Sequence, residues 1–196
     1  HASKTLQDGG IIAFATETVY GLGCDTFNQN AIETVYRLKN RPKQNPTIAH
    51  IDEVSWAHRL TDSWTPECDK LAEAFWPGPL TIVLPKKETV PATACGGRNT
   101  IAIRLPSHPV ARQLLARFGH PISAPSANKS GYISPTTAKH VEEEFGGEVT
   151  VLDGGQCKEG IESTVLSLVI EPTILRPGTI SLFEIEEIIG PVSKTI

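Results

Sequence analysis

Near the N-terminus the sequence reads Gly9-Gly10-Ile11-Ile12-Ala13-Phe14-Ala15, followed by Thr16-Glu17-Thr18-Val19-Tyr20-Gly21-Leu22-Gly23. The apolar part predicts a buried strand over residues 11–15, because it is short, unbroken and preceded by glycines. Residues 30–40 then carry apolar side chains at helical spacing, and this helix is expected to end before Pro42. The order of a strand followed by a helix recurs along the chain and decides the fold class.

Further apolar runs predict strands over residues 47–51, 80–84, 100–104, 121–124, 149–152 and 164–170. Helical spacing, with Pro at the start or Gly at the end, predicts helices over residues 65–76, 109–118 and 137–145. The alternation indicates a single α/β domain over residues 1–196, with a mixed sheet flanked by helices. In such folds, ligands bind in loops outside the strand ends.

The composition is that of a globular protein with a packed core. Hydrophobic residues make up 39% of the 196 residues and charged residues 20%, and the formal net charge is −4. This balance disfavours both a disordered chain and a protein that coats nucleic acid through global positive charge. The sequence shows no run that would span a bilayer and no secretory leader, so we expect no membrane contact and a cytoplasmic location. His1-Ala2-Ser3 is interpreted as a cloning remnant.

The cysteines do not suggest a metal site. The four thiols, Cys24, Cys68, Cys95 and Cys157, lie far apart without a paired or histidine-flanked spacing. They are expected to be small buried side chains that stay reduced, although one nucleophilic cysteine is an alternative.

The segment over residues 15–23 follows the first predicted strand and combines hydroxyls with glycines. Glycines let a ligand approach the backbone closely, and hydroxyls can hydrogen-bond to it. A plain turn between strands is an equally good interpretation of this segment.

A cluster of three cations, Lys39, Arg41 and Lys43, lies at the end of the helix predicted over residues 30–40. Lysine binds phosphate as a point charge and arginine as a two-pronged fork, so the pair Lys39-x-Arg41 is a candidate phosphate site. Taken alone, a solvated helix end that complements the helix dipole is the simpler interpretation. The sequence contains no P-loop.

Three later segments carry further polar groups at predicted strand ends. Arg104 ends an apolar strand, so it is expected to meet either a ligand anion or an internal carboxylate. Residues 123–131 and 134–136 crowd hydroxyl and amide side chains into one loop, which suits a phosphate and a sugar but could be a surface loop. Residues 160–165 again place hydroxyls at a strand start, and Arg176 ends another strand.

The order of these blocks resembles the YrdC/Sua5 family over about residues 5–185 of this chain. The blocks are Thr-x-Thr-Val-Tyr-Gly-Leu-Gly, Lys-x-Arg with Asn-Pro-x-x-x-His, Arg-x-Pro-x-His-Pro, Ser-x-Asn, Glu-Ser-Thr-Val and Arg-Pro-Gly. The resemblance implies a twisted open mixed sheet flanked by helices around a large basic cavity. It also implies the short form, with one YrdC-like domain and no C-terminal Sua5 domain.

The resemblance implies a nucleotidyltransferase. Enzymes of this family make L-threonylcarbamoyl-AMP from L-threonine, bicarbonate or CO₂, and ATP, and they release pyrophosphate. Mg²⁺ would arrive bound to ATP. The product would pass to a tRNA threonylcarbamoyltransferase for the t6A modification at position 37 of ANN-decoding tRNAs.

The resemblance also assigns residue roles. Lys39 and Arg41 would act in catalysis. L-Threonine would be held by Thr18, His50, Arg104, Ala124, Ser163 and Thr164, with Arg104 on its carboxylate. ATP would be held by Lys39, Arg41, Asn45, Thr100, Ser126, Asn128, Ser134 and Arg176.

Three alternatives stay open at this point. An RNA-binding protein could use the same basic concavity for tRNA or double-stranded RNA without making an adenylate, although few aromatic residues lie among the cations. A carbamoyl-adenylate domain like that of hydrogenase maturation proteins is a second alternative. A related protein that kept the fold and lost the activity is the third.

Overall fold

The computed structural model describes residues 1–195 of the chain. The helices are α1 (Ala2–Gln7), α2 (Gln29–Leu38), α3 (Val54–Leu60), α4 (Pro66–Phe75), α5 (Pro109–Phe118), α6 (Ala138–Phe145) and α7 (Leu182–Ile189), with one 3₁₀ turn, η1 (Ala92–Cys95). Among the described helices, none combines the length and the apolar character that crossing a membrane requires.

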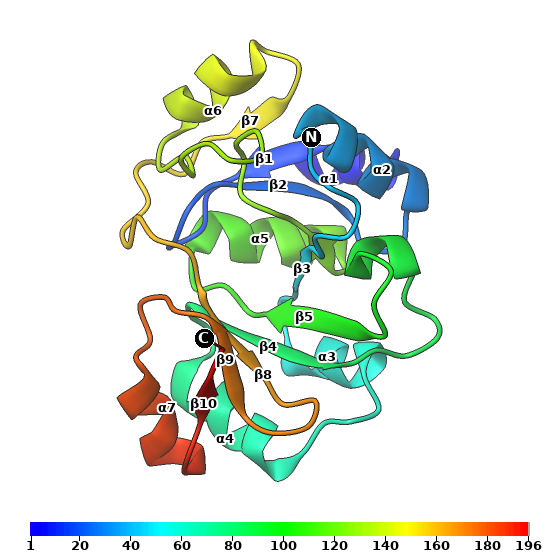
Figure 1. The fold of residues 1–196 in the computed structure, drawn as a ribbon. Helices are drawn as coiled ribbons and strands as arrows, with labels where there is room; N and C mark the ends of the chain where they lie inside the picture. Colours follow the sequence, from blue (N-terminus) through cyan, green and yellow to red (C-terminus); the bar gives the residue numbers. More distant parts are fainter. Residues whose placement is uncertain (196) are drawn as a thin grey trace.

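The strands form one mixed sheet. They are β1 (Ile12–Phe14), β2 (Gly21–Asp25), β3 (Ile48–His50), β4 (Leu80–Pro85), β5 (Thr100–Arg104), β6 (Ile122–Ser123), β7 (Thr150–Leu152), β8 (Thr164–Ser167), β9 (Thr173–Arg176) and β10 (Ser193–Lys194). Their order in the sheet is β10-β9-β8-β4-β5-β3-β6-β2-β1-β7. Figure 1 shows β1, β2 and β7 with α1, α2 and α6 in the upper part, and β4 and β8–β10 with α4 and α7 in the lower part.

The predicted alternation of strands and helices is confirmed, and the element ends follow the expected chemistry. Helix α4 starts with Pro66, and α5 runs from Pro109 to a left-handed glycine, Gly119, with φ 76°. The helix predicted over residues 30–40 is observed as α2, which begins one residue earlier, at Gln29. The cap is Asn28, whose side chain accepts a hydrogen bond from the Ala31 N–H.

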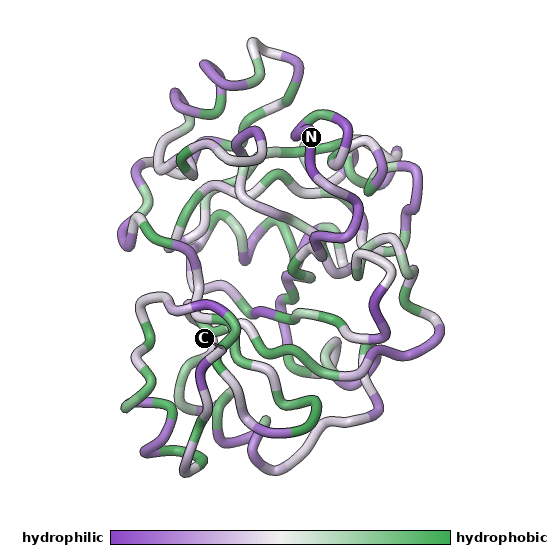
Figure 2. The backbone as a smooth tube through the Cα atoms, in the orientation of Figure 1, coloured by the Kyte–Doolittle hydropathy of each residue, from purple (hydrophilic) through white to green (hydrophobic). Residues whose placement is uncertain are grey.

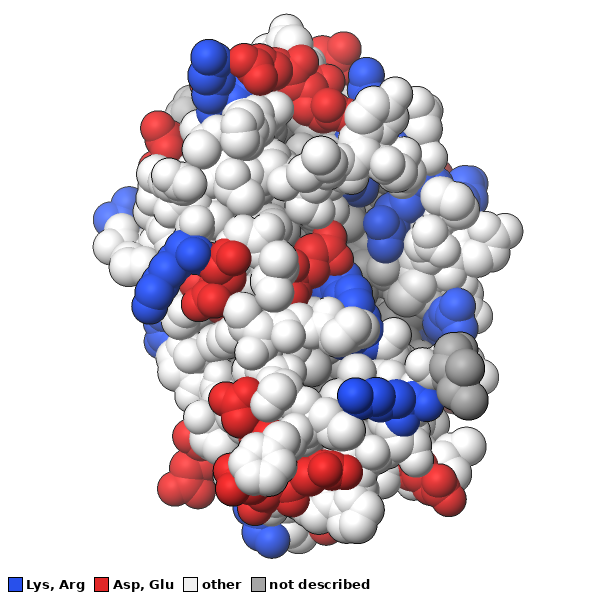
Figure 3. All heavy atoms as spheres, turned by 60° about the vertical axis from the view of Figure 1, so that its left-hand side comes forward, with Lys and Arg blue, Asp and Glu red and all other residues white. Residues whose placement is uncertain are grey.

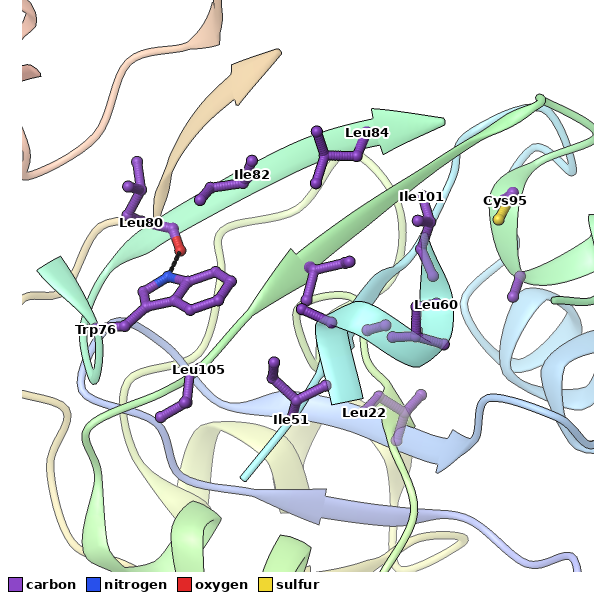
Figure 4. Packing of buried hydrophobic residues seen from close by; sticks show 14 of the residues in the cluster. Leu22, Ile51, Leu60, Trp76, Leu80, Ile82, Leu84, Cys95, Ile101 and Leu105 are labelled. Carbon is purple, nitrogen blue, oxygen red and sulfur yellow. Dashed lines mark hydrogen bonds between the residues drawn. The ribbon is translucent and has the colours of Figure 1, made fainter. Parts of the chain in front are cut away.

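Two hydrophobic clusters cover the sheet. Helices α1 and α5 pack against β1 through a cluster that contains Leu6, Phe14 and Leu115, all fully buried. The larger cluster lies under α3 and α4, where the Trp76 Nε1 donates to the Leu80 carbonyl at 2.7 Å (Figure 4). In Figure 2 hydrophobic and hydrophilic residues alternate along α6, as expected for a helix with one face on the core.

Strand pairing brings the polar blocks together. Strands β3 and β5 are parallel neighbours, and their register places His50 opposite Arg104. The same strand β3 pairs with β6, which leads into the Ser126 loop. The ends of three strands that are far apart in the sequence therefore meet at one place in the middle of the sheet.

Candidate active site

A cavity of about 590 Å³ lies where these strand ends meet. Most of the predicted site residues line it: Thr18, Arg41, Asn45, His50, Thr100, Arg104, Ala124, Ser126, Ser163 and Arg176. The charged side chains of its wall are four arginines, the predicted three and Arg98, together with Glu162. Figure 3 shows Lys and Arg side chains gathered around a hollow on one face of the molecule.

Arg104, at the end of β5, is held in the cavity wall by an ion pair and hydrogen bonds. Its Nη2 forms an ion pair of 2.6 Å with Glu17, and its Nη1 donates to the Thr18 hydroxyl at 2.9 Å. Its Nε donates to the Gly78 carbonyl at 3.3 Å. A guanidinium has five N–H donors, so these bonds leave two donors for a ligand. That is the number needed for a two-pronged contact with a carboxylate.

Glu17 is fixed on both oxygens. Its second carboxylate oxygen accepts from the backbone N–H groups of Ser107 and His108, at 3.1 and 3.3 Å. Burial raises the pKa of Glu17, but the Arg104 charge and these hydrogen bonds outweigh it and hold the pKa below its ordinary value. Glu17 is therefore ionised at neutral pH and locks the Arg104 guanidinium in place.

His50 lies beside Arg104 as a neutral ring. Its Nδ1 is 3.1 Å from the Ile48 carbonyl oxygen, which can only accept, so a proton on Nδ1 would be donated there. Burial and the neighbouring Arg104 charge lower the pKa of His50 to about 3. A neutral imidazole suits a ligand hydroxyl or amine better than an anion.

Arg41 reaches the cavity from the loop after α2. Its Nη2 donates to the Pro46 carbonyl at 2.9 Å and its Nε to the Asn45 carbonyl at 3.2 Å. Its guanidinium carbon also lies 6.0 Å from the centre of the Tyr36 ring. These contacts support the planar group from one side, so its remaining donors are available to phosphate oxygens.

Lys39 lies behind the cavity wall, although it was predicted beside Arg41 in the phosphate site. Its Nζ donates to the backbone carbonyls of Ser126 and Asn128, and the residue is 1% exposed. Burial and the Arg41 charge lower its pKa to about 8. In this structure Lys39 braces the loop that carries Ser126.

Three other predicted residues also lie outside the cavity lining. The Thr164 hydroxyl donates to the Ile180 carbonyl at 2.7 Å, which ties β8 to the segment before α7. The Asn128 amide donates to the carbonyls of Lys129 and Tyr132, both at 2.9 Å. The Ser134 hydroxyl donates to Glu162 at 3.0 Å. Asn128 and Ser134 thus shape the loop at one side of the cavity.

Arg176 enters the cavity beside Glu162, with which its Nη1 forms an ion pair. Its Nη2 donates to the Ser163 hydroxyl at 3.0 Å, and its Nε to the Ser163 carbonyl at 3.1 Å. The two charged side chains are 37% and 33% exposed, so this pair is partly open to solvent.

Sequence reasoning missed Glu17 and Glu162 as site residues. Each lies inside a block that was singled out for its hydroxyls. The signal for Glu17 was the arginine at a buried strand end, which needs a carboxylate or an anion. That signal could not show which acid residue meets Arg104. The four cysteines are free and buried, as predicted.

The chain is similar to known proteins over most of its length. The Sua5/YciO/YrdC family model, described as "Telomere recombination", matches residues 4–178. A threonylcarbamoyl-AMP synthase of Pyrococcus abyssi is 45% identical over 97% of this chain, and one of Bacillus subtilis is 43% identical over 97%. This chain spans 57% and 56% of those two proteins, little more than half their length.

Solved structures show the same fold. P. abyssi Sua5 complexed with L-threonine superimposes with a TM-score of 0.97 at 44% identity, over 99% of this chain and 58% of that one. E. coli YciO superimposes with a TM-score of 0.84 at 24% identity, over 94% of this chain and 90% of that one, and this likeness concerns the fold alone. Given the match of the family model over most of its length, the chain belongs to the Sua5/YciO/YrdC family.

Proposed function

We propose that this chain makes L-threonylcarbamoyl-AMP from L-threonine, CO₂ or bicarbonate, and ATP. The observation that carries the proposal is one cavity with two kinds of anion-binding group. A rigid arginine, Arg104, lies beside hydroxyls and a neutral histidine, and Arg41, Arg98 and Arg176 line the remaining wall. The relatives named threonylcarbamoyl-AMP synthase, and the L-threonine complex of P. abyssi Sua5, support this assignment.

L-Threonine would bind with its carboxylate on the free donors of Arg104. The Thr18 hydroxyl, 2.9 Å from Arg104, and the His50 ring would then face its polar groups. The Ser163 hydroxyl, hydrogen-bonded to Thr81 at 2.8 Å, supplies another polar atom on the β8 side. A site with this many fixed partners favours a substrate that presents a carboxylate, an amine and a hydroxyl together.

ATP would bind with its phosphates among Arg41, Arg176 and Ser126. Lys39 would act from behind, because it holds the carbonyls of the loop that presents Ser126. We expect Mg²⁺ to enter as its complex with ATP. Among residues 1–195 there is no group of three or more His, Cys, Asp or Glu side chains that could hold a metal ion.

The reaction needs positioning more than covalent help from the protein. The neutral threonine amine attacks CO₂, a C–N bond forms, and loss of a proton leaves a carbamate. A carbamate oxygen then attacks the α-phosphorus, its P–O bond forms, and the bond to pyrophosphate breaks. Fixed cations would stabilise the charge that develops on the phosphate oxygens, and the cavity walls would limit the access of water to the carbamate.

The product would be handed to a tRNA threonylcarbamoyltransferase in the cytoplasm, which is part of the same proposal. The test is release of pyrophosphate by purified protein given ATP, Mg²⁺ and bicarbonate, with and without L-threonine. We expect release that depends on threonine and product of the mass of threonylcarbamoyl-AMP. Folded protein that binds RNA but releases no pyrophosphate would instead favour the RNA-binding alternative.

A further inference from the structure

Glu162 is an unexpected residue in a cavity proposed to bind ATP. It is the one acidic side chain among the described residues that line the cavity, and it lies among four arginines. A carboxylate in this position repels the phosphates of an incoming nucleotide unless it moves or has a partner. The contacts of Glu162 show which hydrogen-bond donors its carboxylate engages.

The Glu162 carboxylate accepts from groups that were predicted to hold ATP. Arg176 pairs with one oxygen, and the Ser134 hydroxyl donates to the other at 3.0 Å. Burial raises the pKa of Glu162, but Arg176 and the hydroxyls of Ser134 and Ser126 outweigh it and keep the pKa below its ordinary value. The ionised carboxylate thus receives the donors that a phosphate would receive.

The Glu162 carboxylate can leave Arg176 by a turn of its side chain. Its side chain is 33% exposed, and the contacts described for its carboxylate come from side chains only. The backbone just before it is held in place, because the Gly160 N–H donates to the Thr18 carbonyl at 3.1 Å, so the side chain is the part that can turn. Partly exposed ion pairs contribute little to stability, so a stronger anion can replace this one.

We propose that Glu162 fills an anion subsite formed by Arg176, Ser134 and Ser126, and that a phosphate group of ATP displaces it. The inference rests on the proposed function. Glu162 then sets the affinity for the nucleotide, because each binding event must separate it from Arg176. The competing role, in which Glu162 orients Arg176 for ATP, predicts the opposite change in affinity.

The test is calorimetric titration with the non-hydrolysable β,γ-imido analogue of ATP. We expect Glu162→Gln to bind the analogue roughly two- to fivefold more tightly than the wild type, on the scale of a partly exposed ion pair. Glu162→Gln should also bind inorganic pyrophosphate more tightly than the wild type does. Glu159→Gln is the matched control, because it removes the same charge from the same segment, outside the cavity lining. It should change the affinity less than twofold.

An unchanged affinity for L-threonine and an unchanged unfolding temperature would show that Glu162→Gln is correctly folded. Equal or weaker binding of the analogue by folded Glu162→Gln overturns the proposal and favours the orienting role. A similar gain in Glu159→Gln also overturns it, since general charge would then explain the effect. Wild-type protein that binds no analogue overturns this proposal together with the proposed function, whereas wild-type binding without a gain in Glu162→Gln overturns this proposal alone.

Discussion

Two arginine–glutamate pairs belong to the same cavity, and they differ in burial and in what else holds them. The side chains of Arg104 and Glu17 are 4% and 8% exposed, and backbone N–H groups take the second oxygen of Glu17. Those of Arg176 and Glu162 are 37% and 33% exposed, and the described contacts of Glu162 come from side chains. The same two residue types thus form one locked pair and one open pair.

The difference suits the two pairs to different tasks within the proposed function. A buried ion pair is costly to break, because the remaining charge stays unpaired in a medium of low dielectric constant. A partly exposed pair is replaced by water or by another ion at little cost. The locked pair is therefore suited to present a fixed guanidinium to a small substrate, and the open pair to exchange its carboxylate for a phosphate.

The largest expected effect is the loss of stability when the glutamate of a pair is replaced by glutamine. Glu17→Gln should lower the free energy of unfolding by about 3–5 kcal/mol, because it strands the buried Arg104 charge. Glu162→Gln should lower it by about 1 kcal/mol or less, because water reaches its partner. Urea unfolding followed by circular dichroism measures both values. Equal losses in the two variants would contradict the division into a locked and an open pair.

The second prediction tests whether Arg104 recognises a carboxylate as a fork. Arg104→Lys keeps the charge but loses the paired donors, so KM for L-threonine should rise about 10- to 100-fold, the value of one or two charge-assisted hydrogen bonds. The KM for ATP should change little. Arg176→Lys is the matched control and should raise the KM for ATP instead. If both variants raised the KM for L-threonine and the KM for ATP to the same extent, the assignment of Arg104 to L-threonine and of Arg176 to ATP would be wrong.

The two pairs also show how far the sequence alone could predict the site. Arg104 at the end of an apolar strand required an anion, yet both a ligand and an internal carboxylate satisfied that requirement. Strand pairing and the turn after β1 bring Glu17 to it, across 87 positions of sequence. Lys39 shows the opposite limit, because its motif was recognised but the position of its side chain was not. It lies in the expected motif, but the carbonyls of Ser126 and Asn128 draw its Nζ behind the wall.

The fold was predictable where an element carries its own end signals. Helix α5 has Pro109 at its start and Gly119 after its end, and its predicted bounds are confirmed. Strand β2 was missed because glycines are poor strand formers. A Cβ at Gly23 would lie 2.6 Å from both Ile122 and Phe14, so glycine is required there by packing that only the folded sheet reveals. Helix α7 was missed although Ser181 and Glu184 form a capping box, a signal present in the sequence.

A third prediction distinguishes the two pairs by how their contributions to stability depend on pH. The pKa of Glu17 is lowered by folding, so its contribution to stability is fully present above the ordinary value of 4.5 and is lost as the pH falls through the folded value. The stability gap between wild type and Glu17→Gln should therefore narrow below pH 4.5, by about 1.4 kcal/mol per pH unit at most. The gap for Glu162→Gln should have the same sign and a smaller size. Urea midpoints measured from pH 6 to pH 3 check this, and a gap that widens in acid would refute the sign.

The smallest expected effect is the response of the two pairs to salt. The screening length falls from about 10 Å at 0.1 M to about 3 Å at 1 M ionic strength, and it acts on charges that solvent reaches. The small stability difference between wild type and Glu162→Gln, about 1 kcal/mol or less, should therefore shrink by several tenths of a kcal/mol in 1 M NaCl. The difference for Glu17→Gln should persist, because its partner lies in the protein interior. Taking each difference at one salt concentration removes the general effect of salt on unfolding. If the Glu17→Gln difference fell as steeply, water would have to reach Arg104, and the locked pair would be as open as the other.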